Sequence, residues 1–519
     1  MLIKTYAGAV HGVDARKIVI EVNAGGIVPP TTRQYYHLVG LPDSAIKEGF
    51  QRMEAAIKNV GFKMLRLKTI VNLAPADIRK EGAAYDLPIA MAYLAASQQI
   101  DAPDINQYMM MGELSLDGSL RPIRGALPIA IKARQEKLKG LFIPKANARE
   151  AAIVNNLDVY GINNIREVID FFEGNLKLEP TFVDTREEFS YNQQQHQVDF
   201  SDVKGQGNIK RALEIAAAGG HNAILIGPPG AGKTMMARRI PTILPPLTLN
   251  EALETTKIHS VAGKLPGNSS LIYQRPFRAP HHTISDVAMV GGGSNPMPGE
   301  ISLAHNGVLF LDELPEFKRS VMEVLRQPME ERKVSISRAR ISVDYPAGFM
   351  LIASMNPCPC GYYNHPEKDC VCSPGVVKKY LNKVSGPLLD RIDLHVEVTP
   401  VSYDELAKMD YKAEPSSSIV ERVVKARERQ QERFKDLPHI HSNAQMNTRM
   451  LREMCPISKP GAMLVKKAME KLKLSARAYD SIIKVSRTAA DLSDSDEIKI
   501  EHLAEAIHFR SLDREGWAG

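Results

Sequence analysis

The residues best suited to chemistry lie in a glycine-rich segment that joins an apolar run to a helix-like run. Residues 223–240 have the sequence AILIGPPGAGKTMMARRI, which fits the G-x-x-x-x-G-K-[ST] pattern of a phosphate-binding loop. Glycines let backbone N–H groups approach a phosphate closely, and the positive end of the following helix dipole stabilises the anion. The residues predicted to bind the nucleotide are Gly227, Pro228, Pro229, Gly230, Ala231, Gly232, Lys233 and Thr234.

Two side chains of this loop, and two carboxylates beyond it, predict ATP and Mg²⁺ as ligands. Lys233 is expected to reach the terminal phosphates, and Thr234 to offer a hydroxyl to Mg²⁺. Residues 307–317, GVLFLDELPEF, form an apolar strand that ends in Asp312 and Glu313. The first carboxylate can hold the Mg²⁺ shell, and the second can polarise the attacking water as a general base. The alternative is that both residues cap a helix.

Three more polar residues follow in an order that favours nucleotide hydrolysis. Asn356 ends the apolar run FMLIASMN, where its amide can orient the lytic water or sense the γ-phosphate. Arg391 precedes a strand in SGPLLDRIDLHVEV, and Arg477 lies at a helix start in LSARAYDS. Either arginine alone is more often a solvated side chain than a catalytic one, so the prediction depends on the whole ordered set.

From about residue 199 to 510 the chain resembles the AAA+ ATPases of the magnesium-chelatase-like branch. The most specific matching segment is 275–317, RPFRAPHHTISDVAMVGGGSNPMPGEISLAHNGVLFLDELPEF. The resemblance implies that Asn356 is sensor 1 and that Arg477 is sensor 2. It also implies that Arg391 is a finger acting on the ATP of a neighbouring subunit, and therefore that the protein forms a ring, usually a hexamer.

Residues 333–346, KVSISRARISVDYP, predict a hairpin with two arginines at its tip. Apolar and polar residues alternate on either side of Arg338 and Arg340, and the phase slips between them. The resemblance implies that this hairpin and a second insertion within 281–300 face the pore of the ring. Guanidinium groups there can bind the phosphates of passing DNA. The alternatives are a solvated tip or a tip that pairs with acidic residues of a neighbour.

Four of the five cysteines lie within CPCGYYNHPEKDCVC, residues 358–372. Clustered cysteines in a cytoplasmic protein favour zinc over disulfides, so a tetrahedral site of thiolates is predicted. His365 could replace one cysteine, and the alternatives are two reduced, inert pairs or a redox-labile loop. The pair His281–His282 is a weaker metal candidate because no carboxylate or cysteine pattern accompanies it. The predicted zinc ligands are Cys358, Cys360, Cys370 and Cys372.

The pattern of strands and helices expected around these residues predicts an α/β protein of several domains. Residues 1–175 follow a β-β-α-β-α rhythm, and 176–198 are polar and aperiodic like a linker. Residues 199–400 are expected to form a P-loop AAA+ αβα core with inserted hairpins. Residues 401–519 are charged and helical, as in a C-terminal lid.

The front domain resembles the Lon-protease-like domain through two segments, 80–97 (KEGAAYDLPIAMAYLAAS) and 112–133 (GELSLDGSLRPIRGALPIAIKA). The resemblance implies that a catalytic serine and lysine would fall near Ala84 and Leu127. Neither residue can attack a carbonyl or take a proton. The front domain is therefore predicted to be a non-proteolytic scaffold or a platform for binding a polymer.

In this order of domains, nearly the whole chain resembles the ComM family, also called YifB. The resemblance implies DNA branch migration during natural transformation. Two other activities stay open: a protein-remodelling ATPase like the motor subunit of a metal chelatase, and an ATP-dependent protease, which the missing dyad disfavours.

The composition is that of an ordinary globular protein. The 519 residues are 44% hydrophobic and 24% charged, with a net charge of +6, which is weak support for a polyanionic partner. No run approaches the roughly 18 apolar residues of a membrane helix, and the first residues have no signal-peptide core. A cytoplasmic protein without a membrane partner is therefore expected.

Overall fold

The chain forms two compact units in the computed structural model. One unit contains Met1–Asn192 and Leu249–Tyr273, and the other contains Gln193–Thr248 and Gln274–Gly519. Because the segment Leu249–Tyr273 belongs to the first unit, the chain passes between the units three times. The structure describes residues 1–29, 35–185, 189, 197–265, 270–293, 295–338, 341–363, 365, 367–400, 413–437 and 439–510.

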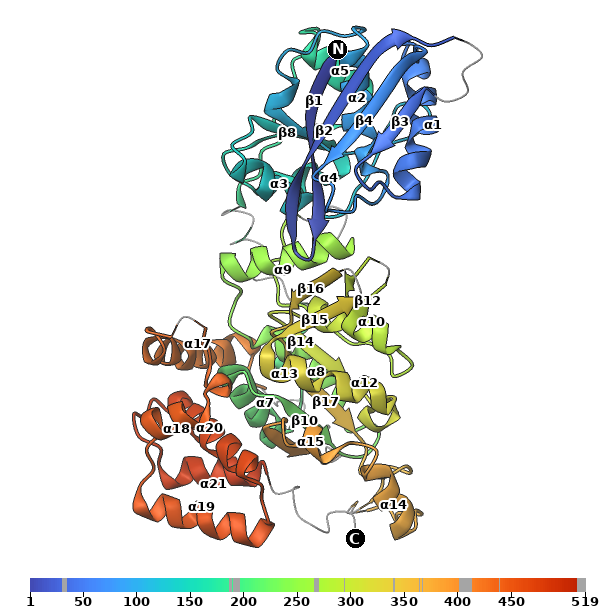
Figure 1. The fold of residues 1–519 in the computed structure, drawn as a ribbon. Coiled ribbons are helices and arrows are strands. Elements are labelled where there is room, and N and C mark those ends of the chain that lie inside the picture. The colour runs from blue at the N-terminus through green and yellow to red at the C-terminus, as the bar shows by residue number, and fades with distance from the viewer. Residues whose placement is uncertain are drawn as a thin grey trace. The chain divides into compact units, whose positions relative to one another are not determined.

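The first unit is built on a seven-stranded sheet in the order β3-β4-β2-β1-β5-β8-β9. Its long strands β1 and β2 pair antiparallel, and buried residues alternate with more exposed ones along β2. Figure 1 shows β1, β2, β4 and β3 side by side in blue. The strands are β1 (Leu2–His11), β2 (Asp14–Ile27), β3 (Tyr36–Val39), β4 (Leu67–Ala74), β5 (Tyr108–Met110), β8 (Gly140–Pro144) and β9 (Asp158–Ile162), and β6 (Glu113–Leu114) pairs with β7 (Leu120–Arg121).

The helices of the first unit cover this sheet, and one of them comes from far along the chain. Helix α2 is buried over its whole length. Helix α9 (Leu249–Ala262), which follows the nucleotide-loop region in the sequence, packs against α3. The other helices are α1 (Ser44–Asn59), α2 (Asp86–Ala96), α3 (Ala126–Gln135), α4 (Lys145–Ala151) and α5 (Ile165–Phe172).

Hydrogen bonds fix α9 to the start of α3. The Gly125 N–H donates to the Ser260 carbonyl at 3.1 Å. The Leu127 N–H donates to the buried Glu150 carboxylate at 2.9 Å, and the Ser260 hydroxyl donates to the same carboxylate. Leu127, near which the resemblance placed the protease lysine, is fully buried here. Helix α9, from the middle of the sequence, therefore completes the core of the first unit.

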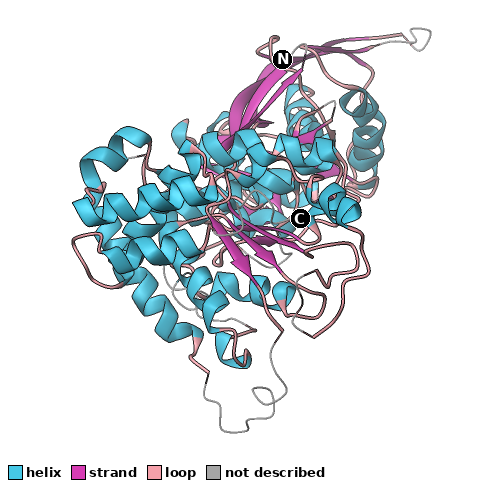
Figure 2. Cartoon of the chain, turned by 90° about the horizontal axis from the view of Figure 1, so that it is seen from below, coloured by secondary structure: helices cyan, strands magenta, loops and turns pink. Residues whose placement is uncertain are grey.

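The second unit has a parallel five-stranded sheet in the order β11-β14-β17-β10-β18. The four residues of β10 and of β14 are all buried, which fits strands covered by helices on both faces. Figure 2 shows the helices in cyan packed around the magenta strands. The strands are β10 (Ala223–Ile226), β11 (Phe277–Arg278), β14 (Val308–Leu311), β17 (Met350–Met355) and β18 (Leu394–Glu397).

Helices and two small hairpins complete the second unit. The helices of its α/β part are α7 (Gly207–Gly219), α8 (Lys233–Arg239), α10 (Asp286–Val290), α11 (Glu300–Leu303), α12 (Arg319–Val324), α13 (Arg326–Glu331), α14 (Pro374–Leu381) and α15 (Gly386–Leu389). The hairpins pair β12 (Gly291–Gly292) with β13 (Met297–Pro298), and β15 (Lys333–Arg338) with β16 (Ile341–Pro346). The predicted hairpin over residues 333–346 is confirmed.

The C-terminal region is helical, as the sequence predicted. It contains α17 (Ser416–Arg433), α18 (Thr448–Met454), α19 (Lys459–Leu472), α20 (Ala476–Leu492) and α21 (Ile500–His508). The mixed α/β fold is thereby confirmed, whereas the Lon-like fold of the front domain stays a prediction. Within the described part of the chain, no helix combines the length and apolarity that crossing a membrane would require.

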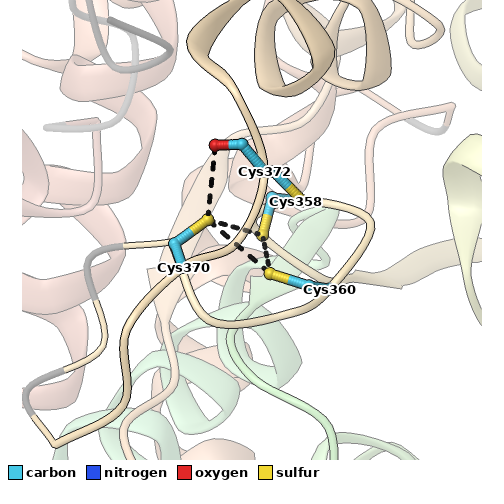
Figure 3. A group of neighbouring side chains, drawn as sticks. All are labelled: Cys358, Cys360, Cys370 and Cys372. Carbon is cyan, nitrogen blue, oxygen red and sulfur yellow. Dashed lines mark hydrogen bonds between the residues drawn. The ribbon is translucent and has the colours of Figure 1, made fainter.

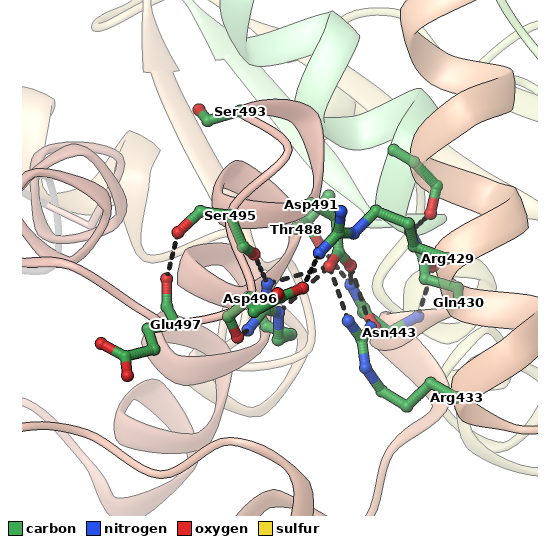
Figure 4. Close-up of polar contacts among 12 residues, drawn as sticks. Arg429, Gln430, Arg433, Asn443, Thr488, Asp491, Ser493, Ser495, Asp496 and Glu497 are labelled. Atoms are coloured by element: carbon green, nitrogen blue, oxygen red, sulfur yellow. Dashed lines mark hydrogen bonds and ion pairs between the residues drawn. The ribbon is translucent and has the colours of Figure 1, made fainter.

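A buried carboxylate joins two of the C-terminal helices (Figure 4). Asp491 in α20 is 3% exposed. It accepts hydrogen bonds from Arg433 of α17 at 2.6 and 2.9 Å, from Arg487 at 3.1 Å and from Asn443 at 2.8 Å. A buried charge is tolerated only when it is paired and hydrogen-bonded. Asp491 therefore fixes α17, α20 and the turn that carries Asn443.

We expect Asp491→Ala to destabilise this helical region by about 3–5 kcal/mol, because it leaves the buried Arg487 and the half-buried Arg433 without their counter-charge. The change can be measured by hydrogen exchange and mass spectrometry as faster amide exchange in α17 and α20.

A matched control is Asp496→Ala, which removes a side chain that is 95% exposed and pairs with Arg429. Its expected cost is below about 1 kcal/mol. Equal exchange rates in the two variants would contradict the role of Asp491.

Candidate nucleotide-binding site

One edge of the parallel sheet gathers most of the predicted nucleotide-site residues. Gly227 follows β10, Asp312 follows β14 and Asn356 follows β17. These three strands are neighbours in the order β14-β17-β10. Because parallel strands end at the same edge, the residues that follow them lie close together.

The backbone of the loop after β10 explains its glycines. Gly230 and Gly232 have φ angles of 77° and 84°, in the left-handed region that side chains rarely adopt. A Cβ atom on Gly227 would lie 2.2 Å from the carbonyl oxygen of Val398. Helix α8 begins directly after this turn, at Lys233. The loop therefore presents backbone to the helix N-terminus, as phosphate binding requires.

Lys233 connects the loop to the end of β17. Its Nζ donates hydrogen bonds to the carbonyl oxygens of Gly227 at 2.7 Å and Pro228 at 2.9 Å, and to Asn356 Oδ1 at 3.0 Å. Burial lowers the pKa of Lys233 to about 8, although the charges of Asp312 and Glu313 oppose the shift. The ammonium group is thus placed among neutral oxygens that the more strongly accepting oxygens of a phosphate can replace.

The predicted Mg²⁺ ligands meet beside Lys233. The Thr234 hydroxyl donates to Asp312 Oδ2 at 2.7 Å, and the Ser354 hydroxyl donates to Asp312 Oδ1. A hydroxyl and a carboxylate are the oxygen ligands that Mg²⁺ prefers, so this donor set fits the ion. Ser354 was missed by the sequence analysis because it lies inside the apolar run of β17, where a small residue is typical of a core strand.

Glu313, the predicted general base, has an unusual backbone and a neighbour that the sequence analysis missed. Its φ of 54° lies in the left-handed region, which turns the chain sharply after Asp312. Its side chain is 58% exposed, and Oε2 lies 4.0 Å from Nδ1 of His282. His282 follows β11, so the sequence separation of the two residues hid this proximity. Among the described residues, the His281–His282 pair does not belong to any metal-binding group.

The two predicted catalytic arginines lie together, at the opposite edge of the sheet. Arg391 precedes β18, whose first residue pairs with Ala223 at the start of β10. The four residues of β10 place Arg391 about 13 Å from the loop along the strand direction. Both Arg391 and Arg477 contact the carboxylate of Glu330, at 2.8 and 2.7 Å. Neither arginine therefore completes the nucleotide site of its own chain.

The two insertions pack against each other. The Tyr345 hydroxyl of β16 donates to the carbonyl of Pro296, between β12 and β13, at 2.7 Å. Arg338 ends β15 and is exposed. A Cβ atom on Gly292 would lie 3.7 Å from the Arg338 guanidinium, so the two hairpins present one surface. Arg340 lies outside the described residues.

The four clustered cysteines also come together. Their sulfur atoms all lie within 4.8 Å of one another, and none of the four cysteines is in a disulfide. His365, the predicted substitute ligand, is not part of this group. Its Nδ1 instead accepts hydrogen bonds from the backbone N–H groups of Glu367 and Lys368.

Known proteins match this chain along nearly its whole length. The family model "Magnesium chelatase, subunit ChlI" matches residues 199–406, "Subunit ChlI of Mg-chelatase" matches 28–147, and "Magnesium chelatase, subunit ChlI C-terminal" matches 413–510. The competence protein ComM of Haemophilus influenzae is 44% identical over 511 residues, 98% of this chain and 97% of that protein. YifB of Escherichia coli is 43% identical, over 98% and 96% of the two chains. The chain belongs to the ComM/YifB family.

Membership of the ComM/YifB family confirms the resemblance found in the sequence and places the second unit among the magnesium-chelatase-like AAA+ proteins. ATPase activity, with ATP and Mg²⁺ as ligands, is in keeping with this class. The chain is also 31% identical to Lon protease 2 of Bacillus subtilis over 157 residues, 28% of this chain and 27% of that protein. The chain thus shares part of its sequence with a Lon protease.

The lowered pKa of Lys233 predicts how nucleotide affinity depends on pH. Phosphate binding favours the charged ammonium, so above pH 8 binding must be accompanied by proton uptake. We expect the affinity for ATP to be nearly constant below about pH 8 and to weaken above it, by at most tenfold per pH unit. Titration calorimetry from about pH 7 to 9.5 measures this profile.

Lys233→Arg is the control, because a guanidinium stays charged over this pH range. The variant should bind ATP more weakly than the wild type, but its affinity should not change with pH. A wild-type affinity that does not change up to about pH 9.5 would rule out this titration.

Proposed function

We propose that the protein is a ring-forming AAA+ ATPase that moves DNA, acting as a branch-migration motor on DNA taken up during transformation. The observation that carries the proposal is the division of the catalytic set. Lys233, Thr234, Asp312, Glu313 and Asn356 gather near one edge of the sheet, whereas Arg391 and Arg477 lie at the other.

The residues of the first edge support ATP hydrolysis by direct attack of water. Glu313 accepts the proton of the attacking water, and Asn356 orients that water. Lys233 exchanges its carbonyl partners for phosphate oxygens and stabilises the charge that accumulates on them. Thr234 and Asp312 would hold Mg²⁺, which neutralises phosphate charge when bound.

The position of the two arginines supports a ring. The proposed transition state has negative charge that Lys233 alone does not balance, and an arginine finger supplies such charge in related phosphoryl transfers. Since Arg391 and Arg477 are far from the loop of their own chain, they can act only on the ATP of another subunit. A head-to-tail contact of this kind closes into a ring when its rotation closes; a hexamer is the form we propose.

Mixing inactive variants tests the trans arrangement. Lys233→Ala and Arg391→Ala subunits should each hydrolyse ATP at background rates. In an equal mixture, a Lys233→Ala subunit can supply Arg391 to a neighbour with an intact loop, so roughly a quarter of the sites should regain activity.

The matched control mixes Lys233→Ala with Glu313→Gln, since both lesions affect residues of the same subunit's site and no intact site can form. ATPase activity that returns in this control, or fails to return in the first mixture, would argue against a finger acting in trans.

DNA is the proposed substrate of the motor. The two hairpins form one surface that carries the exposed Arg338, and Arg340 follows it in the sequence. Arginines bind backbone phosphates without reading sequence, which suits a motor that must pass over any DNA. The Haemophilus relative is named a competence protein, which is consistent with action on incoming DNA.

DNA binding measured against salt tests these arginines. Arg338→Ala with Arg340→Ala should lower the slope of log affinity against log salt by about 0.9 for each phosphate that the variant no longer binds. ATPase stimulation by a four-way junction should fall, while hydrolysis without DNA stays unchanged.

The double variant Arg449→Ala with Arg452→Ala removes the same charge from exposed positions of α18, and it should leave the slope near the wild-type value. A slope that falls equally in both double variants would show only a net-charge effect. ATPase stimulation by a partner protein, and none by DNA, would instead favour a remodeller of the chelatase type.

A further inference from the structure

The four clustered sulfur atoms have the spacing of a metal-thiolate tetrahedron (Figure 3). The sulfur of Cys358 lies 3.3 Å from that of Cys360 and 3.7 Å from that of Cys370, and the last two are 3.6 Å apart. A tetrahedron with zinc–sulfur bonds of about 2.3 Å has edges of about 3.8 Å. A disulfide would bring two sulfurs to about 2.05 Å. The three distances are therefore those of ligands around one ion, and the sulfur of Cys372 lies within 4.8 Å of the other three.

The cluster lies partly inside the protein. Cys358 is fully buried, and the other three cysteines are partly exposed, so the ion would be shielded on one side by protein.

We propose that Cys358, Cys360, Cys370 and Cys372 form a structural zinc site. Four soft thiolates select zinc over Mg²⁺ or Ca²⁺, and four protein ligands leave no open position for catalysis. Binding of Zn²⁺ releases the thiol protons to solvent. The ion would close a loop of fifteen residues, and the described residues of this loop are in neither a helix nor a strand.

The place of this loop shows what the ion would hold in position. The loop begins directly after Asn356 and leads into α14. Within it, a Cβ on Gly361 would lie 2.4 Å from Pro229 of the phosphate-binding loop. Zinc would therefore fix a segment that continues from Asn356 and packs against the phosphate-binding loop, a consequence that rests on the proposed ATPase function.

Metal analysis of the full-length protein, purified without chelators, tests the site directly. We expect about one zinc per chain, absent from Cys358→Ser and from Cys370→Ser. The matched control is Cys455→Ser. Cys455 is buried, its sulfur contacts the sulfur of Met446, and it lies outside the cluster. Cobalt added to metal-free wild-type protein should give the intense visible bands of tetrahedral thiolate ligation.

Wild-type protein supplies a second measurement that does not depend on how the variants fold. A mercurial reagent that titrates the thiolates should release the zinc, with about four thiols modified for each ion. Far less than one zinc per chain would overturn the proposal, as would unchanged zinc in Cys358→Ser, or protein prepared under reducing agent that contains two disulfides instead of zinc.

Kinetics of the zinc-free protein then test the link to the nucleotide site. Removal of zinc should lower kcat for ATP hydrolysis at least several-fold with a smaller change in nucleotide affinity, because Lys233 and the rest of the loop remain in place. Zinc content decides the site itself even if no ATPase activity is found. An unchanged kcat in zinc-free protein would disprove the link, while leaving the zinc site established.

Discussion

The parallel direction of five strands is the constraint on which the nucleotide site depends. Since β10, β14 and β17 run side by side in one direction, the residues after them share one edge of the sheet. Lys233, Asp312 and Asn356 come together there although they are far apart in sequence. Strand β18 runs in the same direction, so the residues before it lie at the other edge of the sheet. The parallel order of the strands therefore brings Lys233, Asp312 and Asn356 together and keeps Arg391 apart from them.

In the single chain, Arg391 and Arg477 are both held by an ion pair with Glu330. Glu330 contacts both Arg391 and Arg477, so a carboxylate provides the charge that a neighbour's nucleotide would provide in a ring. Burial also lowers the pKa of Arg391, and the nearby charges of Arg477 and Arg326 act in the same direction. Two cations held this closely would be better stabilised by a polyphosphate than by one carboxylate, so in the proposed ring the ATP of a neighbour would favour assembly.

Local sequence signals predicted the parts of the site whose chemistry is contiguous in the chain. The loop from Gly227 to Thr234, the Asp312–Glu313 pair and the β15–β16 hairpin each depend on neighbouring residues, so pattern and spacing identify them. Ser354 and His282 escaped because their roles arise only when separate strands meet. The partner of α9 could not be predicted either, because the buried side chains of this helix include Thr255, Thr256 and Ser260, so its sequence shows no clear apolar face.

Because of helix α9, neither unit can be expressed whole as one continuous segment of the chain without part of the other. The helix lies in sequence between the nucleotide loop and β11, yet it fills the core of the first unit beside α3. An ATPase unit expressed from residue 193 onward would lack the surface that buries α9, and it would expose Ala252, Ile258 and Val261 to solvent. An isolated ATPase would have to omit Leu249–Tyr273 as well and rejoin the chain, and the front unit expressed alone would be missing part of its interior.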